Sequence, residues 1–176
     1  TSMVIAELNP RLPRSHGETL LQMDEIDYFI VADRPLLTIP DMEPSKEETQ
    51  IGRFVAELIP DYATIQVGIG KLANSILRSL KNKKGLGMHS GSITEPVMEL
   101  MELGVITNEK KEVCPFKTVC TTITGSEALY EFADKNPNIE LMPISFTHSA
   151  AVISSINRFY AINSALEVDL SGQVNA

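Results

Sequence analysis

The stretch 63–80, ATIQVGIGKLANSILRSL, joins a strand pattern to a helix pattern through two glycines. Its first residues are β-branched and apolar, which is typical of a strand, and its later apolar residues recur at helical spacing. Glycines at such a junction let a ligand approach the backbone closely, and the start of the helix offers unpaired N–H groups to an anion or a carbonyl oxygen. The stretch therefore predicts an α/β fold with a ligand site at the turn.

The rest of the chain alternates in the same way. Strands are expected within 3–14, 26–33, 116–124, 139–146, 158–165 and 166–170, and helices within 49–59, 95–103, 126–136 and 149–157. In the first of these helices the apolar residues Ile51, Phe54, Val55, Leu58 and Ile59 share one face. This alternation implies an open, mostly parallel sheet with helices on both faces, whose ligands collect at the carboxyl ends of the strands.

Composition excludes several classes of function. The 176 residues are 43% hydrophobic and carry 15 basic against 23 acidic side chains, so a net charge of −8 disfavours nucleic-acid binding. No apolar run reaches the roughly 20 residues of a membrane span, and no secretory signal opens the chain. Neither the two cysteines nor the three histidines have metal-site spacing. We expect a cytoplasmic protein with no metal and no membrane partner.

Three prolines within Arg34–Glu48 indicate a connection between two parts of the chain. The basic run Arg78–Lys84 is either a solvated helix end or a patch for a phosphorylated small molecule. Near the end of the chain, Glu167 and Asp169 lie two apart on an expected strand. They are either an acid–base pair or ordinary solvent-facing residues.

The glycine turn satisfies the letters G-x-G-x-x-A of a dinucleotide site. That site also needs an acid about twenty residues on, to bind the ribose hydroxyls. The corresponding region, KKGLGMHSG (83–91), has none. A structural turn or a different ligand is therefore favoured over a nicotinamide or flavin.

The stretch 87–106, GMHSGSITEPVMELMELGVI, has two interpretations. It is either a helix entry in which Ser92 or Thr94 caps the first amides and Glu95 lies near the positive end of the dipole, or a loop that presents a group to the pocket. His89 is a candidate acid–base group, although a lone histidine is more often packed, and Ser90 has no visible base.

Together, six segments resemble the acetyl-CoA hydrolase/transferase family, which includes the 4-hydroxybutyrate and butyryl-CoA:acetate CoA-transferases. They are VIAELNPRLPRSHG, IDYFIVADRPL, IQVGIGKLANSIL, GMHSGSITEPVMELMELGVITN, GSEALYEFADKNP and AINSALEVDLSGQVNA. They occur in the family's order and span nearly the whole chain. The resemblance implies a CoA-transferase-like fold of two α/β domains with coenzyme A bound between them.

The resemblance also implies which residues form the site. The acyl-CoA thioester is attacked by a glutamate carboxylate, and a backbone amide stabilises the charge that develops on the carbonyl oxygen. That amide falls at Val67, and CoA contacts fall on Gln66, Val67, Gly68, Ile69 and Gly70, with Ile162 and Asn163 along the same cofactor.

Two departures from the family pattern follow. Members with the nucleophile read G-x-H-(S/T)-E before the helix, but here the fifth position is Gly91. Glu95 is the nearest substitute, four residues on and about 6 Å along a helix axis. The family also extends beyond both ends of this chain. We therefore expect 1–45 to be the tail of the first domain with its connection, and 46–176 to be most of the second.

Three functions remain open at this point. The first is an acyl-CoA:carboxylate CoA-transferase or acyl-CoA hydrolase, acting on small-molecule acyl-CoA and carboxylate. The second is a non-catalytic module or subunit that binds CoA or acyl-CoA, and the third is an unrelated nucleotide-binding domain. Acyl specificity is not predicted, and association into a homo-oligomer is an alternative to a monomer.

Overall fold

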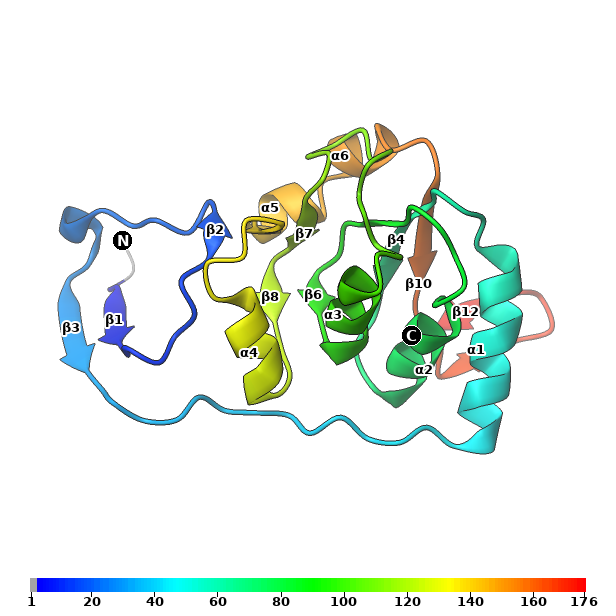
Figure 1. The fold of residues 1–176 in the computed structure, drawn as a ribbon, viewed down its shortest axis with the longest axis horizontal. Coiled ribbons are helices and arrows are strands. Elements are labelled where there is room, and N and C mark those ends of the chain that lie inside the picture. Colours follow the sequence, from blue (N-terminus) through cyan, green and yellow to red (C-terminus); the bar gives the residue numbers. More distant parts are fainter. Residues whose placement is uncertain (1–2) are drawn as a thin grey trace.

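The computed structural model describes residues 3–176 (Figure 1). Its strands are β1 (Ile5–Leu8), β2 (His16–Gly17), β3 (Tyr28–Val31), β4 (Thr64–Val67), β5 (Gly87–Met88), β6 (Ser92–Ile93), β7 (Thr118–Cys120), β8 (Thr122–Ile123), β9 (Ile139–Leu141), β10 (Phe159–Ile162), β11 (Glu167–Val168) and β12 (Val174–Asn175). Its helices are α1 (Lys46–Leu58), α2 (Lys71–Ser79), α3 (Glu95–Glu102), α4 (Glu127–Ala133), α5 (Ile144–Thr147) and α6 (Ala150–Ser154), with a 3₁₀ turn, η1, at Met23–Glu25.

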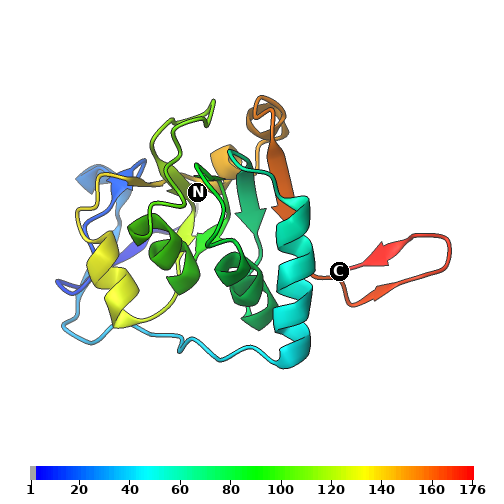
Figure 2. The same ribbon diagram turned by 45° about the vertical axis from the view of Figure 1, so that its right-hand side comes forward.

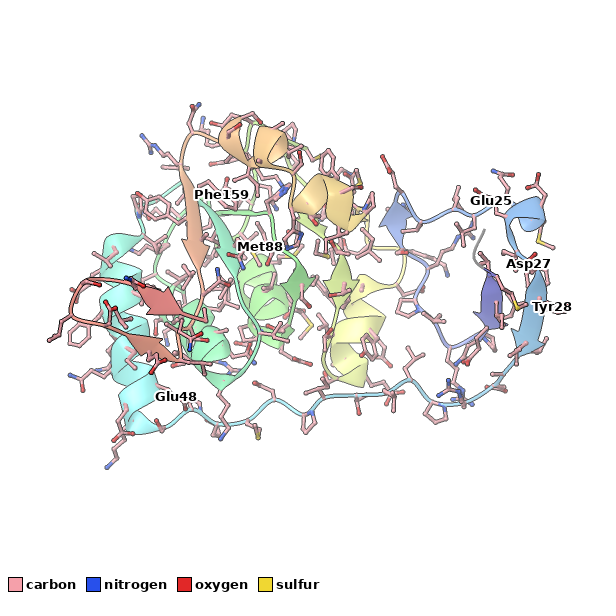
Figure 3. The ribbon with its side chains drawn as sticks, turned by 180° about the vertical axis from the view of Figure 1, so that it is seen from behind. Glu25, Asp27, Tyr28, Glu48, Met88 and Phe159 are labelled. Atoms are coloured by element: carbon pink, nitrogen blue, oxygen red, sulfur yellow. The ribbon has the colours of Figure 1, made fainter. Side chains whose placement is uncertain are left out.

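The main sheet is parallel and open. Strands β10, β4 and β5 pair in that order, β7, β9 and β2 pair in that order, and a parallel bridge between His89 and Val119 joins the two sets. From β4 to β9 the chain advances across the sheet through α2, α3 and α4, and then returns through α5 and α6 to place β10 beside β4. Because crossovers between parallel strands are right-handed, this reversal puts α5 and α6 on the opposite face, the one seen in Figure 3. The predicted α/β class is confirmed.

Helix α1 turns only part of the predicted apolar face inward. A capping box between Ser45 and Glu48 begins the helix, as its sequence favours. Of that face, Ile59 is buried and Val55 packs against the core, whereas Ile51, Phe54 and Leu58 are exposed. The buried positions within the helix are Gly52 and Ala56. Small residues are buried at these positions because they let α1 lie directly against α2. This is the most extensive helix–helix contact among the described residues.

This close packing makes Gly52 sensitive to substitution. A Cβ atom there would lie 2.7 Å from Ser79 Oγ and 2.8 Å from the Ser75 carbonyl oxygen. We expect Gly52→Val to lower the free energy of unfolding by about 2 kcal/mol, the cost of forcing a side chain into a packed interface. Urea unfolding measures the change, and Gln50→Val, at an exposed position of the same helix, is the matched control. Equal losses in the two variants would contradict the packing.

Three other segments differ from the predicted pattern. The strand expected at 139–146 ends at Leu141, and Pro143 begins α5 instead, because proline supplies no ladder N–H but suits a helix start. The strand expected at 116–124 is interrupted at Thr121. The last expected strand is β11, which pairs antiparallel with β12 in a hairpin that projects from the body (Figure 2).

The first 45 residues are less separate from the rest than expected. Strands β1 and β3 pair only with each other, but β2 pairs with β9 at the edge of the main sheet. The connection that follows β3 runs along the helices, where Leu37 accepts a hydrogen bond from Tyr130 and Asp41 is paired with Arg78. The division of the chain near residue 45 stays a prediction.

Candidate functional site

The turn between β4 and α2 is open to a ligand. Gly70 begins the helix with a φ of 108°, a value that favours glycine, and no side chain caps the helix. The hydrogen bond from Asn74 N to Gly70 O starts the intrahelical ladder, so the amides of residues 71–73 precede it. Backbone N–H groups at such an end attract anionic or carbonyl oxygens.

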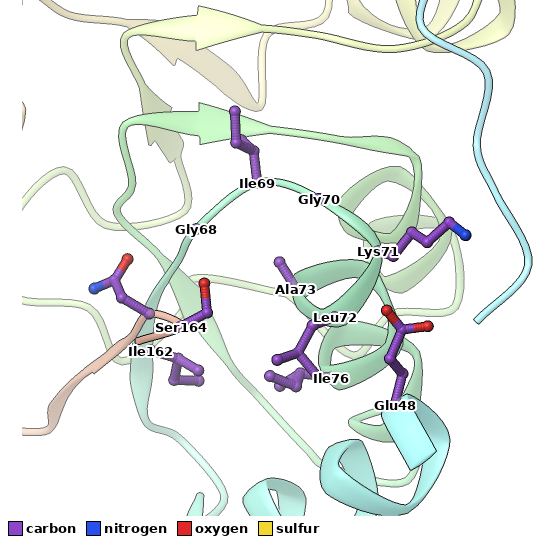
Figure 4. A pocket seen from close by; sticks show the side chains of 11 residues that line it. Glu48, Gly68, Ile69, Gly70, Lys71, Leu72, Ala73, Ile76, Ile162 and Ser164 are labelled. Atoms are coloured by element: carbon purple, nitrogen blue, oxygen red, sulfur yellow. The ribbon is translucent and has the colours of Figure 1, made fainter. Parts of the chain in front are cut away.

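A cavity of about 220 Å³ lies against this turn (Figure 4). It is lined by residues of the turn, the two helices and the end of β10: Glu48, Gly68, Ile69, Gly70, Lys71, Leu72, Ala73, Ile76, Ile162, Asn163 and Ser164. The Lys71 side chain points away from the cavity in Figure 4. The walls therefore combine backbone and apolar side chains with the polar side chains of Glu48, Asn163 and Ser164, and the first amides of α2 lie beside them.

The wall of the cavity at the ends of β4 and β10 brings together residues far apart in the sequence. The side-chain amides of Gln66 and Asn163 hydrogen-bond to each other at 3.1 and 3.0 Å, although they are 97 positions apart. The amide of Gly68 donates to Ile162 O at 3.0 Å. A Cβ on Gly68 would lie 3.3 Å from Asn163 Oδ1, so glycine keeps this wall close. Of the predicted residues, Gln66, Gly68, Ile162 and Asn163 thus converge on one site.

The remaining two predicted residues of the turn differ in exposure. Ile69 is 69% exposed and points away from the others in Figure 4, whereas Val67 is buried. The amides of Thr64 and Gly68 donate toward β10. Because successive residues of a strand alternate in direction, the Val67 N–H points to the other side, toward the chain that follows β5.

Gly91 lies at the same edge of the sheet, one strand away. The residue before it, Ser90, donates its hydroxyl hydrogen to the Val67 carbonyl at 3.1 Å. The Gly91 carbonyl accepts from the amides of Thr121 and Thr122, which holds the loop against β8. The imidazole of His148 lies where a side chain at Gly91 would begin, as a Cβ there would be 3.1 Å from His148 Cε1.

Glu95, the candidate substitute nucleophile, has another partner. Its carboxylate is buried, accepts the amide hydrogen of Ser126, and fills the space where a Cβ on Gly125 would lie. It therefore holds the start of α4 instead of facing the turn at Gly68. The expected capping of α3 also differs, because the Thr94 side chain accepts no hydrogen bond from a helix amide, and its hydroxyl donates to Asn74 Oδ1.

His89 is a packed residue. It is fully buried between Phe146 and Phe159, and its Nε2 lies 3.0 Å from the Thr147 carbonyl oxygen. Its Nδ1 has no hydrogen-bond partner within residues 3–176. Burial, reinforced by the positive charge of Lys111, holds the pKa of His89 below its usual value. The interpretation of His89 as a packed side chain is thus the one that the geometry favours.

The remaining candidates are structural. Asp169 accepts hydrogen bonds from the hydroxyl of Ser171 and the amide of Gln173, and the Ser171 bond in particular lowers the pKa of Asp169. It shapes the tip of the hairpin, while Glu167 binds Asn175 across it. The first residue of the basic run, Arg78, is paired with two carboxylates.

Two polar residues were not identified from the sequence: one lies beside the site, and the other supports a nearby loop. His148 had no motif around it, and only its contact with Gly91 draws attention to it. Lys111 lies in a run of ordinary charged residues but is 3% exposed, and burial lowers its pKa to about 8. No spacing signal in the sequence could have identified either residue, because both contacts arise from folding.

Related proteins show the family to which this chain belongs. The model of the acetyl-CoA hydrolase/transferase C-terminal domain matches residues 125–176. The 4-hydroxybutyrate coenzyme A transferase of Clostridium kluyveri is 41% identical over 98% of this chain, and the succinyl-CoA:cyclohexane-1-carboxylate CoA transferase of Geobacter metallireducens is 37% identical over 97%. The chain belongs to the acetyl-CoA hydrolase/transferase family. It spans 40% and 39% of the lengths of these two relatives.

A solved structure supports membership of the acetyl-CoA hydrolase/transferase family and confirms the CoA-transferase-like fold. The 4-hydroxybutyrate CoA-transferase of Porphyromonas gingivalis superimposes with a TM-score of 0.93 at 37% identity, covering 98% of this chain and 44% of that one. Within residues 3–176, no helix is long and apolar enough to cross a bilayer. Nor does that part of the chain bring together three or more side chains that could hold a metal ion.

Proposed function

We propose that the protein containing this chain is a cytoplasmic enzyme that either transfers CoA from an acyl-CoA to a carboxylate or hydrolyses the acyl-CoA thioester. The observation that carries the proposal is the convergence of three features at one sheet edge: the open start of α2, the Gln66–Asn163 pair and the side-chain-free Gly91. Family membership narrows the ligand to an acyl-CoA. Metal ions have no part in the proposed reaction.

The proposed roles follow from the backbone. Oxygen atoms of CoA bind at the Gly68–Gly70 turn, where the first amides of α2 are directed, and the chain of the cofactor lies against Ile162 and Asn163. The Val67 N–H stabilises the oxyanion that forms when the thioester carbonyl is attacked. A fixed amide is effective there because it needs no reorganisation as the charge develops.

The cavity is smaller than a whole CoA-sized site, which typically exceeds about 300 Å³. The proposal therefore assigns the other half of the site to the remainder of the protein, with residues 1–45 belonging to the tail of a first domain and 46–176 to most of a second. Acetyl-CoA hydrolase/transferase relatives are more than twice as long as this chain, which leaves room for such a half.

A binding module without turnover is the second candidate function. The observation that favours it is that Gly91 offers no nucleophile and that the Glu95 carboxylate is engaged by Ser126. The two functions separate when the full-length protein is incubated with acetyl-CoA and an isotopically labelled carboxylate. Labelled acyl-CoA or free CoA supports the enzyme, whereas bound CoA with an intact thioester supports the module.

Filling the glycine turn should weaken binding. We expect Gly68→Leu to raise the dissociation constant for CoA about tenfold, a loss of about 1.4 kcal/mol, because the new side chain enters the cavity and crowds Asn163. Isothermal titration calorimetry of the full-length protein measures it. Asn82→Leu adds the same side chain at an exposed loop before β5, at the opposite edge of the sheet, and should leave the affinity unchanged. Equal affinities for the two variants would argue against this site.

A further inference from the structure

The space beside Gly91 is occupied by an imidazole. A methyl group placed on Gly91 would lie 3.1 Å from Cε1 and 3.3 Å from Nε2 of His148. His148 follows α5 at its C-terminal end and is exposed, unlike the fully buried His89. The Cε1–Nε2 edge of the His148 ring therefore lies beside Gly91, where the loop has no side chain.

The other ring nitrogen of His148 is held in place. Its Nδ1 lies 2.9 Å from the hydroxyl oxygen of Thr147, which in turn lies 2.7 Å from the hydroxyl oxygen of Thr121. Thr147 is 3% exposed, so the hydroxyl that contacts Nδ1 is itself held in the core. When Nδ1 carries the hydrogen and donates it to Thr147, the hydroxyl of Thr147 donates onward to Thr121. Nε2 is then the unprotonated nitrogen, directed at Gly91.

This imidazole lies at the proposed thioester site. Ser90, which precedes Gly91, contacts the carbonyl of Val67, and the Val67 N–H points to the same side of β4. An acyl group bound at the Gly68 turn, with its carbonyl oxygen on the Val67 amide, would therefore have the Gly91 position and the His148 edge next to it. The arrangement has a base, His148 Nε2, a group that orients it, the Thr147 hydroxyl, and an oxyanion donor, the Val67 N–H.

We infer that His148 is the general base of an acyl-CoA hydrolase reaction, an inference that rests on the proposed function. Nε2 takes a proton from water as the water oxygen bonds to the thioester carbonyl carbon. The carbonyl π electrons move to oxygen, where the Val67 amide stabilises them. When the tetrahedral intermediate collapses, the carbon–sulfur bond breaks, and the sulfur takes the proton from Nε2. The products are a carboxylic acid and the CoA thiol.

The test compares hydrolysis of acetyl-CoA by the full-length protein and its variants. His148→Ala should lower kcat/KM about 100-fold or more, the usual worth of a positioned proton acceptor, and added imidazole should restore part of the rate. His16→Ala removes an exposed histidine on β2, away from Gly91. It should change neither kcat/KM nor the effect of added imidazole. CoA affinity measured by calorimetry should be the same in all three proteins, within about a factor of two.

The outcomes separate the inference from the proposed function. Unaltered hydrolysis in His148→Ala, loss without imidazole rescue, or a wild-type protein that binds CoA but hydrolyses nothing would overturn the role of His148. A wild-type protein that does not bind CoA at all would overturn the proposed function itself. Oxygen-18 from labelled water should appear in the carboxylate product of the wild type, and its absence would also exclude direct attack by water.

Discussion

Replacing Gly91 by glutamate is expected to raise CoA transfer from acetyl-CoA to a carboxylate on the order of 100-fold, the size of effect that correct placement of a reacting group has. The new carboxylate would enter beside the Val67 amide and could form an anhydride and then a glutamyl thioester. The backbone at Gly91 does not have a positive φ, so a side chain is tolerated there. The His148 ring, which is the end of an exposed side chain, has to move by a few tenths of an ångström.

The control for this variant is Gly91→Gln, which adds the same volume without a carboxylate. Transfer rates are measured with labelled acetate, and a borohydride-reduced or hydroxylamine-released adduct is located by mass spectrometry. The adduct should map to residue 91 in the glutamate variant and be missing in the glutamine variant. A folded Gly91→Glu protein with wild-type transfer rates and no adduct would disprove the alignment of Gly91 with the family's nucleophile.

A second large effect is expected from Lys111, which supports the loop near the site. Its ammonium group is buried and donates to the carbonyl oxygens of Met88, at 2.9 Å, and Lys117. Burial lowers the pKa of Lys111 from 10.5 to about 8. The charged form is thus disfavoured in the folded state relative to the unfolded one.

The sign of the pH dependence follows from this pKa. Between pH 8 and 10.5 the unfolded chain keeps its proton on Lys111 while the folded chain has lost it, so stability increases as the pH rises. Since each pKa unit corresponds to about 1.4 kcal/mol, the contribution of Lys111 to the free energy of unfolding rises by about 3 kcal/mol over this range.

Urea unfolding of wild type and Lys111→Met at a series of pH values isolates that contribution, because other titrating groups are common to both proteins. The difference between the two free energies should grow by about 3 kcal/mol from pH 8 to 10.5. Lys110→Met, at the exposed neighbouring position, should run parallel to wild type. Parallel curves for Lys111→Met would mean that the ammonium is not buried in solution.

Local chemistry made much of the fold predictable. Eighteen residues were enough to predict strand β4, the glycine turn and helix α2. The signals used, β-branched residues, glycine and helical periodicity, all depend on residues that are close together in the chain. The same kind of pattern was only partly right for α1, where Val55 and Ile59 face the core but the other three of the five apolar residues are exposed. Packing against α2 selected Gly52 and Ala56 instead, since the smallest residues allow the closest approach.

The site was predictable only in part: the glycines marked the turn between β4 and α2, and the family resemblance named further residues. That resemblance named Gln66 and Asn163, which the structure pairs, but gave no reason to examine His148. It also left Glu95 open as a substitute nucleophile, whereas its actual neighbour is the amide of Ser126.

By itself, the sequence determined where strands change into helices and which positions, such as Gly68 and Gly91, carry no side chain. The strand and helix boundaries depend on backbone preferences and short-range periodicity. Only the tertiary structure decided which groups meet. The histidine beside Gly91, the buried ammonium of Lys111 and the partner of Glu95 come from segments that lie far apart in the chain. Their positions depend on strand order, crossover direction and side-chain volume, and no local pattern encodes those through-space distances.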